Sequence, residues 1–121
     1  MNRMIRPIVL HPDARLKKKS VEVEGITDAL IELAEDMMET MYHAPGIGLA
    51  APQIGVLQRV IVMDCAKKED EEPDPIVMVN PLIKASSEEK NVDEEGCLSI
   101  PEHFAEVTRP ELVQVEWTDL N

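Results

Sequence analysis

One amphipathic segment, residues 27–43, constrains the fold of this 121-residue chain more than any other feature. Within it, apolar side chains recur at spacings of three and four residues and acidic side chains occupy the opposite side, as in a helix with one buried face. The apolar positions are Leu30, Leu33, Ala34, Met37, Met38 and Met41, and the acidic ones are Asp28, Glu32, Glu35 and Glu39. Thr27 can cap the first turn, and Pro45 with Gly46 ends the pattern. The sequence predicts one long helix whose methionines fill the core.

Three segments after this helix have the composition of β-strands. Residues 59–64 and 76–83 are β-branched apolar runs bounded by turn residues. Residues 112–119 alternate, with Val113, Val115 and Trp117 on one face and polar side chains on the other. One long N-terminal helix with mostly antiparallel short strands packed around it indicates an α+β fold. A chain of this length corresponds to a single domain, residues 1–121.

The charge of the chain excludes several classes of function. It has 12 basic and 24 acidic residues, a net charge of −12, so its surface repels phosphate backbones. No apolar run approaches the roughly 18 residues of a membrane span, the N-terminus lacks a signal-peptide pattern, and two cysteines do not make a disulfide framework. We therefore expect a cytoplasmic protein that binds neither a membrane nor, directly, nucleic acid.

The charges are unevenly distributed along the chain. The first 20 residues carry six basic side chains against one acidic, and their run Lys17–Lys19 is interpreted as a solvated loop. Acidic residues gather at 69–74 and 88–95. The first of these clusters contains Pro73 and predicts an exposed loop between two strands.

The first stretch with a possible chemical role is Gly46-Ile47-Gly48-Leu49-Ala50-Ala51-Pro52-Gln53, directly after the helix. Its small side chains leave the backbone accessible, which suits an extended peptide lying against it. Gln53 supplies an amide that can donate a hydrogen bond into that space. Packing of the small residues against a sheet is the structural alternative.

The second stretch is Glu94-Glu95-Gly96-Cys97-Leu98-Ser99-Ile100-Pro101. Cys97 can be a nucleophile, a metal ligand or a buried thiol. The negative local charge raises a thiol pKa and disfavours the nucleophile, whereas it favours a bound cation. Cys65, at the end of an apolar run, is interpreted as a structural thiol.

Together the two stretches resemble the peptide deformylase family, the metal hydrolases that remove the formyl group from the N-terminal methionine of new bacterial proteins. The segments Leu10–Leu16 and Glu39–Tyr42 are similar to that family as well, so the resemblance covers essentially the whole chain. It implies a deformylase-like fold, formylmethionyl nascent peptides as substrates, and a divalent metal, with Fe2+ first and Zn2+ or Ni2+ as alternatives.

The resemblance also assigns roles to individual residues. Cys97 matches a metal ligand, and Gln53 and the backbone N–H of Leu98 match the donors to the oxyanion that forms when water attacks the formyl carbon. The substrate peptide is expected to lie along backbone at Gly46, Ile47 and Gly48 on one side and at Gly96 on the other. Glu95 matches a structural carboxylate of the pocket and is expected to pair with Arg109.

The sequence departs from the family in three places. It contains no His-Glu-x-x-His motif, the helical source of two further metal ligands and the general base. The remaining histidines, His11, His43 and His103, do not have the spacing of a ligand pair. Asp93 stands where an apolar or aromatic residue is usual, and Phe104 replaces a basic residue that some relatives carry.

The missing motif leads to several expectations. The chain is expected to be C-terminally incomplete, to bind metal weakly and to be inactive alone. Leu33, Met37, Met41 and Trp117 are expected to be exposed, so that the chain alone self-associates, holds a partner segment or is poorly folded. Three possibilities stay open: an incomplete deformylase, a non-catalytic deformylase-like module that binds a peptide or partner, and one half of a split enzyme completed by a second chain.

Overall fold

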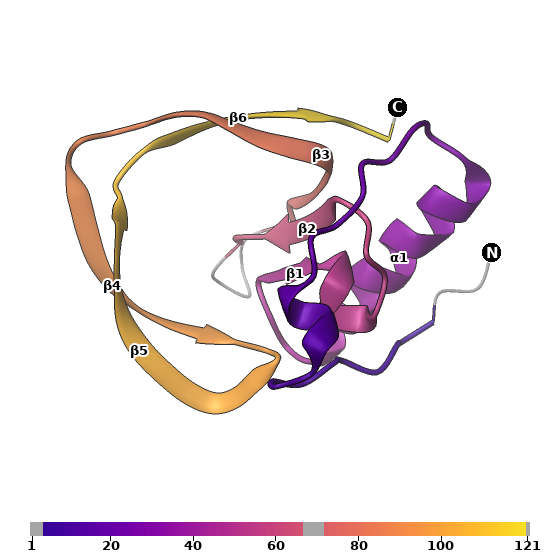
Figure 1. The fold of residues 1–121 in the computed structure, drawn as a ribbon, viewed down its shortest axis with the longest axis horizontal. Helices are drawn as coiled ribbons and strands as arrows, with labels where there is room; N and C mark the ends of the chain where they lie inside the picture. Colours follow the sequence, from indigo (N-terminus) through magenta and orange to yellow (C-terminus); the bar gives the residue numbers. More distant parts are fainter. Residues whose placement is uncertain (1–3, 67–71, 121) are drawn as a thin grey trace.

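The computed structural model describes residues 4–66 and 72–120. Helix α1 packs against the two strands that follow it, and the later strands extend to one side and curve back (Figure 1). In chain order the elements are η1 (Ala14–Lys17), α1 (Asp28–His43), β1 (Gly48–Ala50), η2 (Ala51–Ile54), β2 (Val60–Asp64), β3 (Pro75–Ser86), β4 (Lys90–Cys97), β5 (Ile100–Pro110) and β6 (Val113–Thr118), with η marking 3-10 helices.

Helix α1 confirms the amphipathic pattern. The Thr27 hydroxyl accepts a hydrogen bond from the Leu30 N–H at 3.1 Å, which caps the first turn. Past the last turn, the Gly46 N–H donates to the Met41 carbonyl oxygen at 2.7 Å. All six predicted apolar positions are buried, and the core that they enter also contains Leu49 and Val62 from β1 and β2.

Two polar side chains of α1 are also buried, which the sequence did not predict. Asp36 is 1% exposed and accepts hydrogen bonds from Arg6 Nε and Nη2 at 3.0 and 2.7 Å and from the Met4 N–H at 2.8 Å. The Thr40 hydroxyl accepts from the Arg6 N–H at 2.9 Å. These contacts hold the N-terminal segment along the helix.

The main sheet is antiparallel and has the strand order β1-β2-β3-β6. Burial alternates along β2, with Val60, Val62 and Asp64 buried, because successive side chains point to opposite faces. The three predicted strand segments are confirmed. Strand β3 is longer than predicted, since it remains paired with β6 up to Ser86.

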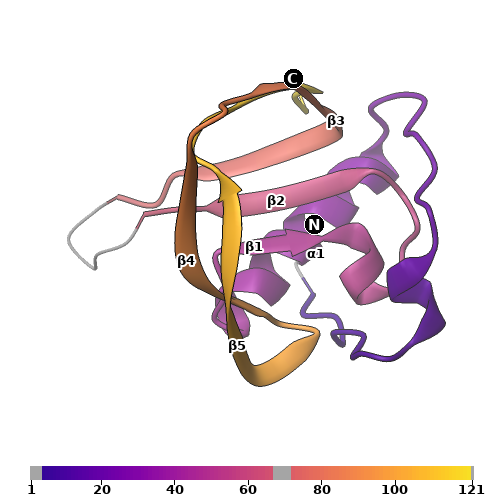
Figure 2. The same ribbon diagram turned by 60° about the vertical axis from the view of Figure 1, so that its left-hand side comes forward.

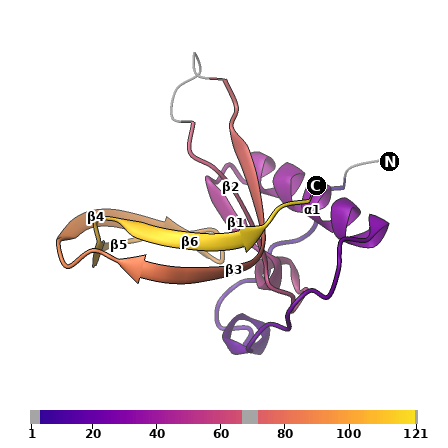
Figure 3. The ribbon, with the colours of Figure 1, turned by 90° about the horizontal axis from the view of Figure 1, so that it is seen from above.

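A second sheet, the β4–β5 hairpin, curves back toward the core. Beyond β3 and β6 the two chain segments stay paired, as the Ser87 N–H donates to the Leu112 carbonyl oxygen at 2.8 Å. Figures 1 and 2 show β4 and β5 then turning across the direction of β1 and β2. Seen from above, the ribbon extends to one side of the layer that contains α1 (Figure 3). The hairpin tip, Leu98–Ser99, returns to the core, where the His11 N–H donates to the Ser99 carbonyl oxygen at 2.8 Å.

Strands β4 and β5 were not predicted from the sequence. Nearly every residue of β4 is exposed, so no apolar alternation marks it. The strand is defined instead by its antiparallel pairing with β5, from Lys90 with Pro110 to Cys97 with Ile100. The acidic cluster at 88–95 therefore lies largely within a strand.

Two further expectations were wrong. Leu33, Met37 and Met41 are buried, because α1 packs on β1 and β2. Cys65 is exposed, since it follows the last residue of β2.

The expected exposure of Trp117 is confirmed at 38%. Of the predicted acidic loop at 69–74, residues 69–71 lie outside the described residues, and residues 72–74 precede β3 without helix or strand structure. Within the described part of the chain, no helix has the length and apolar character needed to cross a membrane.

Candidate functional site

An open groove of about 920 Å3 lies between the tip of the β4–β5 hairpin and the segment after α1. Both sequence motifs line this groove, although the two residues central to them are 44 positions apart. Its walls contain every residue expected at the site: Gly46, Ile47, Gly48, Gln53, Glu95, Gly96, Cys97 and Leu98. The fold thus brings together the residues that the sequence analysis selected separately.

Gln53 is held by hydrogen bonds at both ends of its carboxamide. It lies in η2, whose tight turn begins at Ala51-Pro52 and points the side chain back at β1. Oε1 accepts from the Ala50 N–H at 3.0 Å, and Nε2 donates to Ser99 Oγ at 3.2 Å. Nε2 also lies 3.7 Å from Cys97 Sγ, so the predicted proximity of the amide and the thiol is confirmed.

Cys97 is exposed at the end of β4, immediately before the two-residue turn Leu98–Ser99. The structure therefore excludes the buried-thiol interpretation for this residue. The Leu98 side chain packs on Gly46, where an added Cβ would lie 2.7 Å from Leu98 Cδ1. This contact holds the turn, and therefore Cys97, beside the segment after α1.

Strand β1 forms a free edge of the main sheet beside the groove. The Asp64 N–H donates to the Ile47 carbonyl oxygen at 3.0 Å, which directs the Ile47 peptide group toward β2. Because the pairing alternates, the N–H and C=O of Gly48 point away from β2. An added Cβ at Gly48 would approach nothing closer than the Val62 oxygen at 3.8 Å. An extended peptide can therefore pair with this edge.

The glycines of the two motifs serve different purposes. The space at Gly46 is filled by Leu98, and an added Cβ at Gly96 would lie 2.8 Å from the Phe104 ring. These two positions thus depend on packing within the chain, against Leu98 and Phe104 respectively. Gly48 leaves backbone accessible to a ligand.

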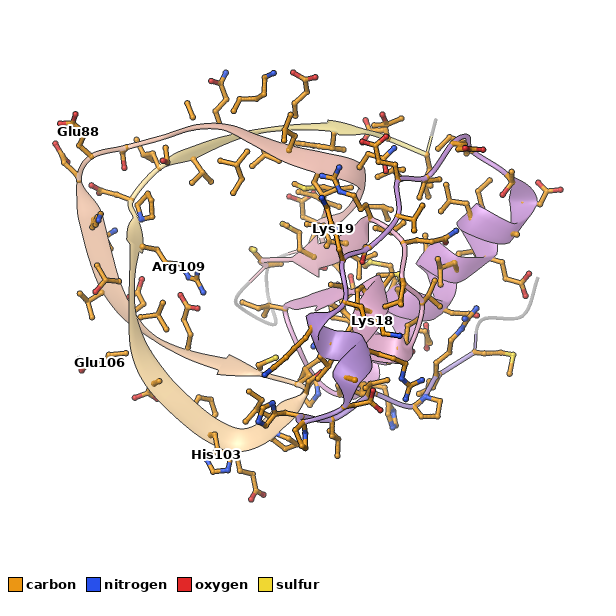
Figure 4. All side chains as sticks on the ribbon, in the orientation of Figure 1. Lys18, Lys19, Glu88, His103, Glu106 and Arg109 are labelled. Atoms are coloured by element: carbon orange, nitrogen blue, oxygen red, sulfur yellow. The ribbon has the colours of Figure 1, made fainter. Side chains whose placement is uncertain are left out.

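The expected pair of Glu95 and Arg109 is confirmed. Arg109 Nε and Nη2 donate to the two Glu95 carboxylate oxygens at 2.7 and 2.8 Å, and Arg109 points to the inside of the curve made by β4 and β5, opposite to Glu106 (Figure 4). The guanidinium lowers the pKa of the Glu95 carboxyl below its ordinary value. Glu95 therefore contributes a fixed, compensated negative charge to the groove.

Three more carboxylates, which we call the acidic rim, line the groove: Asp93, Glu94 and Glu102. The rim has no ion-pair partner among the described residues, and neither lysine nor arginine lines this groove. Phe104 is exposed on the same wall. The described groove is thus negatively charged with one aromatic side chain at its edge.

A second hollow, of about 520 Å3, lies near Lys19 and Arg59. The Arg59 guanidinium donates to the Pro81 carbonyl oxygen and lies 3.5 Å from a Glu22 carboxylate oxygen. Its cation is therefore already engaged, and none of the eight residues expected at the site lines this hollow.

The chain offers one soft metal donor in the groove, the Cys97 thiol. Within residues 4–66 and 72–120, no three His, Cys, Asp or Glu side chains are grouped to hold a metal ion. A catalytic metal centre of the zinc type needs about three protein ligands. The described residues alone therefore do not complete one.

Sequence reasoning missed the residues that connect the two motifs. Ser99 is buried and accepts from Gln53, and the Val9 and His11 N–H groups donate to the carbonyl oxygens of Gln53 and Ser99 at 2.7 and 2.8 Å. The only sequence signals were the position of Ser99 inside the second motif and that of His11 in the N-terminal segment.

The fold is similar to that of solved peptide deformylases. The enzyme from Ehrlichia chaffeensis matches with a TM-score of 0.90 and 38% identity over 97% of this chain and 70% of that chain. A structure from Acinetobacter baumannii with Met-Ala-Ser bound matches with a TM-score of 0.89 and 32% identity over 98% of this chain and 79% of that chain. The fold and the two-motif groove thus place the chain in the deformylase class of folds.

The sequence comparisons name the family. The peptide deformylase of Rhizobium meliloti is 53% identical over 115 residues, which are 95% of this chain and 66% of that protein. The polypeptide deformylase profile matches residues 5–121. The chain belongs to the polypeptide deformylase family, and it spans about two thirds of the length of the curated relatives that it matches.

Proposed function

We propose that this chain provides the cysteine-bearing part of a cytoplasmic, metal-dependent deformylase that removes the formyl group from the N-terminal methionine of newly made proteins. The observation that carries the proposal is the convergence of the Gln53 amide and the Cys97 thiol, 3.7 Å apart, in an open groove beside a free strand edge.

In the proposed reaction the chain binds the peptide and stabilises developing charge. The formylated peptide pairs with the free edge of β1 at Gly48 and lies along the adjoining backbone at Ile47, and Gly96 lies along its other side. Gln53 Nε2 and the Leu98 N–H donate to the formyl oxygen as it becomes negative. Preorganised donors of this kind are commonly worth about 3 kcal/mol each in barrier height.

The proposed metal would be held in part by Cys97. An exposed thiolate among carboxylates suits a divalent first-row ion, with Fe2+ the first expectation and Zn2+ or Ni2+ the alternatives. When bound, such an ion supplies an activated water at neutral pH. Because the described residues do not group three ligands, we propose that two histidines and a glutamate of a His-Glu-x-x-His segment, which the 121 residues do not contain, complete the site.

The test compares hydrolysis of formyl-Met-Ala-Ser, with Fe2+ or Ni2+, by the 121-residue chain and by the same chain with a His-Glu-x-x-His-bearing segment fused to its C-terminus. We expect turnover only with the segment, abolished by Cys97→Ala. The matched control is Cys65→Ala, which removes the other exposed thiol and should leave turnover unchanged.

Other outcomes distinguish the remaining possibilities. Restoration by a separately expressed segment would assign a split enzyme. Binding of Met-Ala-Ser without turnover in any arm would assign a non-catalytic peptide-binding module. The absence of both binding and turnover would refute the proposal. Turnover by the chain alone would overturn the expected need for a second segment.

A further inference from the structure

Ser99 has a buried hydroxyl beside a groove whose other residues are mostly open to solvent. It is the second residue of the hairpin turn and is 3% exposed. The turn itself is closed by the backbone pairing of Cys97 with Ile100. The Ser99 hydroxyl is instead directed at Gln53, whose Nε2 donates to Oγ at 3.2 Å.

The hydrogen bonds of the Gln53 carboxamide direct one donor at the Ser99 hydroxyl and the other at the Cys97 thiol in the groove. A carboxamide has one acceptor oxygen and two N–H donors on its nitrogen. The Ala50 N–H engages Oε1 at 3.0 Å, so Nε2 is turned toward the hairpin tip. One N–H of Nε2 is used by Ser99, and the other is on the side of Cys97, whose sulfur is 3.7 Å away.

The backbones of the two residues are held by one N-terminal segment. The Val9 N–H donates to the Gln53 carbonyl oxygen at 2.7 Å, and the His11 N–H donates to the Ser99 carbonyl oxygen at 2.8 Å. Because this segment sets the spacing of both backbones, the main remaining freedom is rotation of the Gln53 side chain. The Ser99 hydroxyl restricts that rotation.

We propose that Ser99 is a positioning residue, whose hydroxyl engages one N–H of Gln53 and so directs the other into the groove toward the oxygen that gains negative charge. The proposal rests on the proposed deformylase function. A donor that is displaced by about 1 Å loses much of its effect on a transition state. The loss on removing the hydroxyl should therefore be in kcat, with KM nearly unchanged.

The first test needs no turnover. In the 15N-labelled chain, the Gln53 side-chain NH2 protons should exchange with solvent more slowly than those of Gln114, which is exposed. Ser99→Ala should shift the two Gln53 resonances and increase their exchange, and Ser99→Thr should restore both. The control Ser87→Ala removes a hydroxyl that is hydrogen-bonded to Glu89 and Leu112 at the far end of the hairpin and should leave the Gln53 signals unchanged.

The second test measures deformylation in the complemented assay described above. Ser99→Ala should lower kcat about tenfold and leave KM within about twofold, Ser99→Thr should restore kcat, and Ser87→Ala should change neither. Fast exchange of the Gln53 protons in the unmodified chain would overturn the proposal even if Ser99→Ala fails to fold. Unchanged Gln53 signals in Ser99→Ala would overturn it too. Absence of turnover in every arm would instead refute the proposed function, while the exchange measurement still decides the role of Ser99.

Discussion

Replacing Arg6 with alanine should strongly destabilise the fold, because it leaves Asp36 without its cation. The Asp36 side chain is 2% exposed, whereas that of Arg6 is 34% exposed. Three donors to the Asp36 carboxylate were described above: the Met4 N–H and two nitrogens of Arg6. After Arg6→Ala, only the Met4 N–H of these three remains. Removing one partner of a buried ion pair costs about 3–5 kcal/mol, and the partial exposure of Arg6 favours the lower end, about 3 kcal/mol.

Thermal unfolding measures this loss. An unfolding entropy of about 2.1 cal/mol/K per residue corresponds, for this chain, to about 0.25 kcal/mol per degree, so Arg6→Ala should lower Tm by about 12 °C. The matched control is Lys84→Ala, which removes the cation of an exposed pair with Glu116 at 3.8 Å and should change stability by less than about 1 kcal/mol.

A second substitution distinguishes the loss of charge compensation from the loss of Arg6 packing, by whether it raises or lowers stability. Asp36→Asn in the Arg6→Ala background removes the uncompensated charge, so the double variant should be more stable than Arg6→Ala alone. A Tm decrease under about 4 °C for Arg6→Ala, or a double variant no more stable than the single one, would refute this account of the N-terminal anchor.

Three further predictions concern the hydrogen bond between Tyr42 and Asp64, the packing of Leu98 on Gly46, and the acidic rim of the groove. The Tyr42 hydroxyl donates to the Asp64 carboxylate at 2.6 Å and is the main cause that lowers the pKa of that carboxyl. The stability gained from this hydrogen bond is fully present above the pKa of an unfolded aspartate, about 3.9. It is lost as the pH falls through the lower pKa of the folded state. Thermal denaturation should therefore show Tyr42→Phe less stable than the unmodified chain at pH 7, with the difference shrinking as the pH falls through the lowered pKa of folded Asp64. A difference that does not change with pH would contradict this. Gly46→Ala should displace Leu98 and weaken Met-Ala-Ser binding, as measured by calorimetry. The control Gly25→Ala, with open space around the added methyl group, should leave that binding unchanged. Equal affinity of the Gly46→Ala variant and the unmodified chain would contradict this prediction. The acidic rim should make Met-Ala-Lys bind about tenfold more tightly than Met-Ala-Glu at low salt, a preference that shrinks in about 0.5 M salt; a salt-independent ratio would exclude an electrostatic origin.

The sequence by itself determined the local elements and the chemistry of the two motifs. The period of apolar residues from Leu30 to Met41 specified a helix and its buried face, because side chains three and four positions apart share one side. Runs of β-branched residues specified β2 and β3. The order of residues around Gln53 and Cys97 identified the family before any geometry was known.

Only the tertiary structure decided which distant groups meet. Strand β4 lacks apolar alternation, since both its faces are largely exposed, so its existence depends on pairing with β5. That pairing and the return of the hairpin to the core bring Cys97 to Gln53 and bury Ser99 between them. The burial of Asp36 likewise depends on Arg6, 30 residues earlier. Such contacts are set by strand register and chain closure, which involve residues far apart in the sequence and therefore leave no local pattern to read.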